Sequence, residues 1–146
     1  MRRMQIPASA AKSGVESAVC PERVLVSVID DDESFRLALV ASLSSLGYRI
    51  RGFASADEFI AEDRAGCYDC IITDIHMPGI GGFDLKRLLA ARGSTVPVIM
   101  ITARGEQGLE SKAAASGAVC LLRKPFETDA LIDCLERATK HWPLIH

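Results

Sequence analysis

The sequence predicts a doubly wound α/β domain in which five parallel strands form one sheet and five helices cover both of its faces. Short apolar runs alternate along the chain with segments whose apolar residues recur at helical spacing, which is the pattern of repeated strand–helix units. The chain has 146 residues, of which 49% are hydrophobic. These values suit one ordinary domain with one core.

Four of the predicted strands are nearly continuous apolar runs, as expected for parallel strands that are covered on both faces. They are residues 24–29, 70–73, 96–101 and 119–122. The segment 48–53 instead alternates apolar and polar residues. We therefore expect it to form a strand with one wetter face, at an edge of the sheet.

The helices are predicted from apolar stripes and capping residues. Gly47 is a natural stop after the first, the capping box Ser55–Glu58 starts the second, and Thr128 is the expected cap of the fifth. The fourth, about 106–115, contains Gly108 and few large apolar residues, so we expect it to be the least firmly held. The expected core residues are Phe35, Leu39, Leu43, Leu46, Phe59, Ile60, Leu85, Leu88, Leu89, Leu131, Cys134, Leu135 and Ala138.

Apolar periodicity, net charge and the length of apolar runs bear on the limits of the domain and on where the protein is found in the cell. Residues 1–22 lack apolar periodicity, so we predict a flexible extension there, a folded domain over 23–141 and a tail over 142–146. The net charge of −2 gives no basic footprint for nucleic acid or anionic membrane. No apolar run approaches the roughly 20 residues that span a bilayer, and no signal peptide is evident. We expect a cytoplasmic protein that does not bind nucleic acid or membrane directly.

The five cysteines are scattered and odd in number, which fits a reducing compartment in which most of them are buried thiols. Cys67 and Cys70 have C-x-x-C spacing, but the pair precedes a strand and has no second Cys or His pair. A redox or zinc function is therefore the weaker interpretation of this motif.

Polar residues follow the predicted strands where these end. Asp30 and Asp31 follow the first strand, Asp74 the third, Thr102 the fourth and Lys124 the fifth. Sites in such sheets lie at the carboxyl ends of the strands. Converging carboxylates repel each other unless a hard cation lies between them, and Mg²⁺ prefers oxygen ligands. The sequence therefore predicts a Mg²⁺ site.

The same set of residues suits phosphoryl transfer. A carboxylate of Asp74 can attack an electrophilic phosphorus atom, while the metal and the Lys124 ammonium offset charge on the transferring oxygens. Thr102 can hydrogen-bond the product. Asp32 and Glu33 are interpreted mainly as residues that cap the first helix and favour its amino end.

In order and spacing, these residues resemble the receiver domain of two-component response regulators over about residues 23–140. The motifs are 28–34 (Val-Ile-Asp-Asp-Asp-Glu-Ser), 73–82 (Thr-Asp-Ile-His-Met-Pro-Gly-Ile-Gly-Gly), 101–103 (Ile-Thr-Ala) and 124–126 (Lys-Pro-Phe). The resemblance implies a flavodoxin-like sheet with strand order 2-1-3-4-5.

The resemblance also implies roles for the acidic residues. Asp74 would be the phosphoacceptor, and Asp30 and Asp31 would hold Mg²⁺, with Asp31 as the direct ligand. Asp74 and the backbone carbonyl of His76 would complete the protein ligands. The phosphoryl donor would be a phosphohistidine on a sensor histidine kinase or a phosphotransfer protein, and the chain would receive the group without being a turnover enzyme.

Further implications concern the switch. Thr102 would bind the phosphoryl group and shift on activation, Lys124 would contact the acyl phosphate, and its bond to the next proline would be cis. The family often has Tyr or Phe three residues before this lysine, where the present chain has Leu121. Coupling to the fourth helix is therefore expected to be weaker or differently built. His76 and Arg104 occupy positions that influence how fast water removes the phosphoryl group.

The expected downstream partner would bind the face formed by the fourth helix, fifth strand and fifth helix, and phosphorylation could drive dimerisation. The sequence style is closest to receivers that precede LuxR-type DNA-binding domains, yet the chain ends at His146 without room for one. We expect either a single-domain regulator or a truncated chain.

Two alternatives remain open. One is a Mg²⁺-dependent phosphatase or phosphotransferase of the haloacid-dehalogenase type with Asp74 as nucleophile, although such enzymes want an acid two residues later, where this chain has His76. The other is a phosphate-independent, receiver-like interaction domain, and Leu121 is the sequence feature in its favour.

Overall fold

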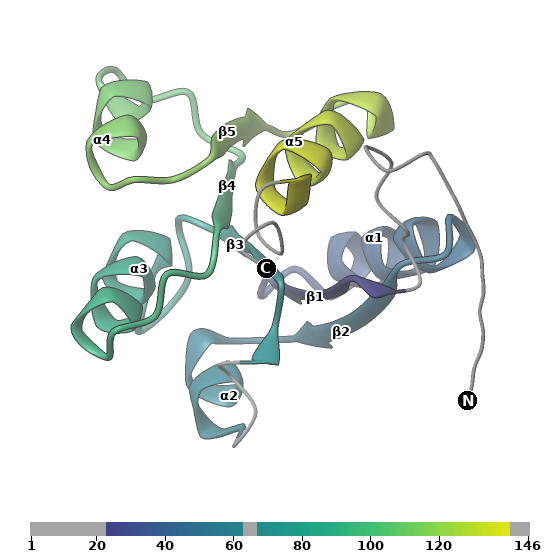
Figure 1. Ribbon diagram of the computed structural model, residues 1–146. Coiled ribbons are helices and arrows are strands. Elements are labelled where there is room, and N and C mark those ends of the chain that lie inside the picture. Colours follow the sequence, from purple (N-terminus) through teal and green to yellow (C-terminus); the bar gives the residue numbers. More distant parts are fainter. Residues whose placement is uncertain (1–22, 63–66, 141–146) are drawn as a thin grey trace.

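The computed structural model describes residues 23–62 and 67–140. The predicted extension over 1–22 and the tail over 142–146 lie outside these residues. Five parallel strands form one sheet in the order β2-β1-β3-β4-β5, as the resemblance implied (Figure 1). The elements in chain order are β1 (Leu25–Ile29), α1 (Glu33–Ser45), β2 (Arg49–Phe53), α2 (Ala56–Ala61), β3 (Cys70–Asp74), α3 (Gly82–Ala91), β4 (Val98–Thr102), α4 (Leu109–Ala115), β5 (Cys120–Arg123) and α5 (Thr128–Lys140).

The sheet separates two apolar layers, and Figure 1 shows α1 and α5 on one side of it and α2, α3 and α4 on the other. Alternate residues of each strand point to opposite faces. In β3, for example, Ile72 packs into the layer of α1 and α5, whereas Ile71 packs into the layer of α2, α3 and α4. Both side chains are fully buried. The central strands are therefore apolar throughout because both of their faces are covered.

The predicted edge strand and the predicted caps Asp32 and Ser55 are confirmed. β2 lies at an edge of the sheet, and its Arg49 and Arg51 are exposed. The Asp32 carboxylate accepts a hydrogen bond from the Phe35 amide (3.1 Å) and caps α1. The Ser55 hydroxyl accepts one from the Glu58 amide (3.1 Å) and caps α2.

Three helix expectations need correction. α4 begins at Leu109 rather than near residue 106, because Gly108 has a left-handed φ of 82° that a helix interior does not allow. Leu46 stands at the C-terminal cap of α1 and is 49% exposed, so it does not belong to the apolar stripe. Thr128 is the first residue of α5, and the preceding Glu127 carbonyl accepts the first helical hydrogen bonds.

The predicted strand over 96–101 also begins later, at Val98. Pro97 has no amide hydrogen to donate to a neighbouring strand, although its carbonyl accepts from the Ile71 amide at 3.0 Å. The apolar run is therefore longer than the strand that it contains.

The cysteines differ from the expectation of buried thiols. Cys120 of β5 and Cys134 of α5 form a disulfide. Cys70 is a buried thiol, as expected, but Cys67 is an exposed one.

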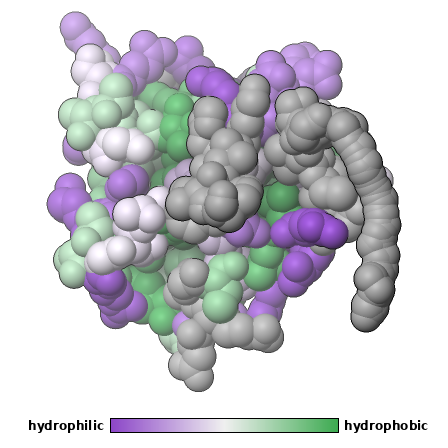
Figure 2. Space-filling model, in the orientation of Figure 1, coloured by the Kyte–Doolittle hydropathy of each residue, from purple (hydrophilic) through white to green (hydrophobic). Residues whose placement is uncertain are grey.

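The visible face of the molecule carries both polar and apolar residues (Figure 2). Figure 2 shows hydrophilic residues bordering the hydrophobic areas that remain visible on one face. Among the described residues, no helix is both long and apolar enough to cross a bilayer.

Candidate functional site

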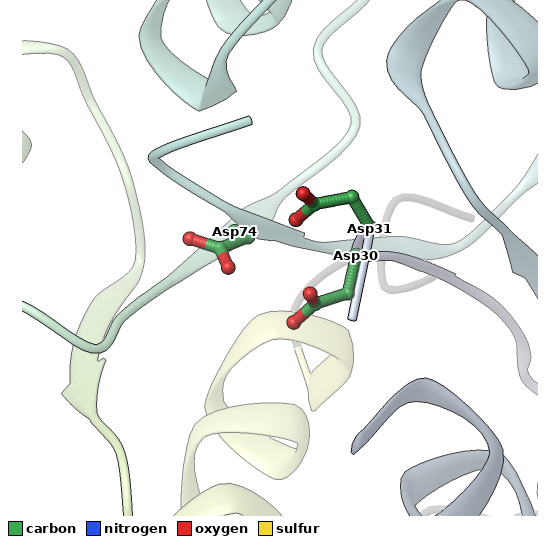
Figure 3. Close-up of side chains that lie close together, drawn as sticks. All are labelled: Asp30, Asp31 and Asp74. Atoms are coloured by element: carbon green, nitrogen blue, oxygen red, sulfur yellow. The ribbon is translucent and has the colours of Figure 1, made fainter. Parts of the chain in front are cut away.

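The acidic cluster lies at the carboxyl ends of β1 and β3, which pair with each other in the sheet. Asp30 and Asp31 directly follow β1, and Asp74 is the last residue of β3. Each of the three offers a carboxylate oxygen within 4.8 Å of the other two. Figure 3 shows the carboxylates of Asp30 and Asp31 turned toward the side on which Asp74 lies. Asp30 and Asp74 are buried, whereas Asp31 is exposed. The predicted convergence of these residues is confirmed.

Lys124, one residue beyond β5, supplies the opposite charge. Its ammonium donates to Asp30 Oδ2 (2.9 Å) and to Asp74 Oδ2 (3.3 Å), and only 15% of its side chain is exposed. The bond from Lys124 to Pro125 is cis, as the resemblance implied. The same ammonium lies 4.0 Å from the centre of the Phe35 ring, a cation–π arrangement.

Backbone amides fix the two buried carboxylates. The Asp32 amide donates to Asp30 Oδ1 (2.9 Å), and the His76 amide donates to Asp74 Oδ1 (3.0 Å). A charged acceptor makes such bonds stronger than neutral ones. Gly82 at the start of α3 lies so close that a Cβ there would be 2.9 Å from the Asp74 carbonyl oxygen. The backbone that carries Asp74 is therefore packed directly against a helix terminus.

The electrostatics of the cluster reflect its burial. Burial raises the pKa of the Asp30 carboxyl, although the Lys124 ammonium and the Asp32 amide act in the opposite direction. Burial alone would lower the pKa of Lys124, but the carboxylates of Asp30 and Asp74 outweigh it and raise that pKa. The single Lys124 ammonium thus contacts two carboxylates, those of Asp30 and Asp74. The oxygen-rich donor set fits a hard divalent cation such as Mg²⁺.

A second network lies beside Asp74, between β3 and the β4–α4 loop. The Thr102 hydroxyl donates to the Arg104 carbonyl (3.0 Å) and accepts from the Arg104 amide (3.0 Å). It also lies 3.3 Å from His76 Nδ1, while His76 Nε2 lies 3.4 Å from a Glu106 carboxylate oxygen. The imidazole therefore connects the Thr102 hydroxyl to the following loop.

Leu121 lies on the face of β5 that packs into the layer of α2, α3 and α4. A hollow of about 390 Å³ adjoins it, and Thr102, Arg104 and Leu109 are among the lining residues. A Tyr or Phe at this position would carry a ring that a leucine lacks. The hollow next to Thr102 is therefore lined by the short, branched side chain of Leu121 instead of by an aromatic ring.

Several contacts of the site were not predicted from the sequence. The Arg36 guanidinium donates to the Asp30 carbonyl (2.7 Å), in addition to the Phe35 ring against Lys124. Their place one turn into α1, directly after the acidic motif, is the signal that could have identified them. The contact between the His76 imidazole and Glu106 had no such signal in the sequence, because it depends on the course of the β4–α4 loop.

A comparison with known families identifies the family of this fold. The family model of the response regulator receiver domain matches residues 26–136. The chain belongs to this family. Receiver domains are signalling modules that work with histidine kinases or phosphotransfer proteins and regulate output domains. The match lies within the domain predicted over 23–141.

Curated relatives include longer regulatory proteins. The chain is 39% identical over 112 residues to the transcriptional regulatory protein FixJ of Azorhizobium caulinodans, covering 77% of this chain and 53% of FixJ. It is 32% identical over 119 residues to the response regulator protein TmoT of Ectopseudomonas mendocina, covering 82% of this chain and 54% of TmoT. The chain thus spans about half the length of these relatives.

Solved structures agree with the fold. The response regulator StyR has a TM-score of 0.76 at 34% identity, over 83% of this chain and 61% of that one. The crystal structure of FixJ-N has a TM-score of 0.73 at 32% identity, over 81% of this chain and 94% of that one. Family membership favours the signalling interpretation over the haloacid-dehalogenase-type alternative.

Proposed function

We propose that this receiver domain accepts a phosphoryl group on Asp74, with Mg²⁺, from a phosphohistidine of a sensor histidine kinase or phosphotransfer protein. The observation that carries the proposal is the position of the Asp74 carboxylate, buried beside the Lys124 ammonium and within 4.8 Å of oxygens from Asp30 and Asp31. A carboxylate so placed is a nucleophile with opposite charge on one side and an oxygen-rich cation site on the other.

In the transfer, an oxygen of Asp74 forms a bond to phosphorus while the bond from phosphorus to the donor imidazole nitrogen breaks. Asp30, Asp31 and Asp74, with the His76 carbonyl, would hold Mg²⁺, which supplies positive charge against the phosphoryl oxygens. The Lys124 ammonium, already 3.3 Å from Asp74 Oδ2, balances further charge on the same group. The acyl phosphate is thereby stabilised relative to one exposed to water.

Thr102 links this chemistry to the surface. Its hydroxyl is engaged by the Arg104 carbonyl and lies near the His76 ring. Donating to a phosphoryl oxygen on Asp74 requires it to leave the Arg104 carbonyl, and this changes the start of the β4–α4 loop. The proposed output face is formed by α4, β5 and α5, where Leu121 sets the space available to the loop. Partner binding and dimerisation through this face are part of the proposal.

The test uses acetyl phosphate and Mg²⁺ with intact-protein mass spectrometry. We expect a gain of one phosphoryl group that is stable to mild acid, labile to base and absent from Asp74→Asn. Asp57→Asn, which changes an exposed aspartate on α2, is the matched control and should be labelled like wild type. Equal labelling of Asp74→Asn and wild type would overturn the proposal.

A second experiment identifies the donor. Phosphotransfer from a panel of sensor histidine kinases, with Asp74→Asn as the control, should show one fast donor. NMR titration with Mg²⁺ should shift the amides of residues 31, 74 and 76 before any phosphoryl donor is added. Absence of such shifts at millimolar Mg²⁺ would favour the phosphate-independent interaction domain.

A further inference from the structure

The disulfide between Cys120 and Cys134 joins β5 to α5, two elements of the proposed output face. Their Cα atoms are 6.2 Å apart, within the usual range for a bonded pair. Cys134 is buried at 3% exposure, whereas Cys120 is only partly buried. In Figure 1, α5 is the yellow helix beside β5. A small reagent would therefore reach the pair through Cys120.

A cation lies against both sulfur atoms. Arg137 Nη2 is 3.0 Å from Cys120 Sγ and 3.8 Å from Cys134 Sγ. Arg137 lies on α5 one turn after Cys134, so the two side chains share a face of the helix. In the reduced protein, a neighbouring cation favours thiolate over thiol, and the thiolate is the form that attacks a disulfide.

Cys70 shows the opposite environment in the same molecule. It is fully buried, its sulfur lies 4.0 Å from the Ile71 carbonyl oxygen, and burial strongly raises its pKa. Such a thiol is inert. The Cys120–Cys134 pair differs from this core cysteine in three ways: a guanidinium lies beside it, Cys120 is partly exposed, and each cysteine has the other as its bonding partner.

We propose that Cys120 and Cys134 are a reversible redox pair, oxidised by low-molecular-weight disulfides such as oxidised glutathione and reduced by the corresponding thiol. The Cys120 thiolate attacks one sulfur of the reagent and releases one thiol. The Cys134 thiolate then attacks Cys120 Sγ and releases the second. The protein dithiol and one reagent disulfide thus become one protein disulfide and two reagent thiols, and the electrons balance. Disulfides formed in reducing compartments are commonly of this regulatory kind.

The pair is placed where it can affect the switch. Along β5, Cys120 and Leu122 face α5, whereas Leu121 faces the opposite layer. β5 ends at Arg123 and is followed at once by Lys124 of the acidic site. The oxidised form therefore restricts the strand that carries Leu121 and directly precedes Lys124. This consequence rests on the proposed function, but the redox chemistry itself does not.

The first experiment measures the redox state without any phosphorylation. The 146-residue chain with Cys20→Ser and Cys67→Ser is equilibrated with buffers of different ratios of oxidised to reduced glutathione. It is then acid-quenched, denatured, alkylated and analysed by peptide mass spectrometry. We expect Cys120 and Cys134 to lose alkylation together as the buffer becomes more oxidising, with a linked peptide appearing, while Cys70 stays alkylated throughout. Alkylation of Cys120 and Cys134 that is independent of the buffer would overturn the proposal.

The second experiment tests Arg137. Without the guanidinium a smaller fraction of the thiol is ionised, although the thiolate that remains is more nucleophilic, so Arg137→Gln should slow oxidation a few-fold near neutral pH. Arg137→Lys keeps the charge and should restore most of the rate, and Glu136→Gln is the control on the same helix. Equal rates in Arg137→Gln and wild type would remove the guanidinium from the mechanism.

A third measurement separates the redox pair from its consequence. Hydrogen exchange of β5 and α5 peptides should be slower in the oxidised than in the reduced protein, and Cys120→Ala should show no redox difference. If the pair oxidises but exchange is unchanged both with and without acetyl phosphate and Mg²⁺, the link to the switch is wrong. If Asp74 is not phosphorylated at all, the proposed function fails while the redox result stands.

Discussion

Replacing Lys124 by methionine should strongly destabilise the domain when Mg²⁺ is absent. The ammonium lies 2.9 Å from Asp30 Oδ2 and 3.3 Å from Asp74 Oδ2. At an effective dielectric constant near 20, each attraction is worth about 5–6 kcal/mol before desolvation. Removing one partner from such a buried pair costs about 3–5 kcal/mol, because the remaining charge is left uncompensated. We expect about 3 kcal/mol here, since Asp31 and the site are open to water.

Urea unfolding followed by circular dichroism measures this loss, with Lys86→Met on α3 as the control. Adding Mg²⁺ should recover part of the stability of Lys124→Met, because both cations compensate the same carboxylates. The recovery should exceed the Mg²⁺ effect on wild type. Equal stability of Lys124→Met and wild type would show that the ion pairs contribute nothing. A Mg²⁺ effect no larger in the variant would refute the shared-charge reasoning.

Three further predictions concern other parts of the molecule. The pKa of Asp30 is raised in the folded state, so ionisation of this carboxyl opposes folding as the pH rises. Without Mg²⁺, the stability of Asp30→Asn relative to wild type should therefore increase from about pH 4 to about pH 7. A difference in unfolding free energy that does not change with pH would contradict this. Leu135→Ala should cost about 2–5 kcal/mol in urea unfolding because Leu135 is fully buried, whereas Leu37→Ala at an exposed site should change little. Gly82→Ala should press a Cβ against the Asp74 carbonyl and slow labelling by acetyl phosphate at least several-fold, and an unchanged rate would show that the backbone there adapts freely.

The fold was predictable because its signals are local and agree with each other. The apolar runs of the central strands, the wetter strand at 48–53 and the caps Asp32 and Ser55 each specify their element from neighbouring residues. The start of α4 was not predictable from the same signals. There, Gly108 adopts a left-handed conformation, and composition alone does not distinguish that from a glycine inside a helix.

The acidic cluster was predictable for a geometric reason. Parallel strands end at one edge of the sheet, so residues at the ends of β1 and β3 lie close together whatever path the loops take. The residues around Thr102 were harder, since the contact of His76 with Glu106 depends on the path of the β4–α4 loop. The pairing of Cys120 with Cys134 was missed because it joins a strand to a helix, and odd, irregular cysteines gave no framework.

The two oxygens of Asp74 have different partners, an amide hydrogen on Oδ1 and an ammonium on Oδ2. A carboxylate in water interchanges its oxygens by rapid rotation, so they are chemically equivalent. Here rotation would break both contacts, and the oxygens become distinguishable. An acyl phosphate formed on this side chain would therefore have one defined orientation, with the bridging oxygen and the carbonyl oxygen fixed in advance. The phosphorylated domain would then present a single stereochemical arrangement to its surroundings.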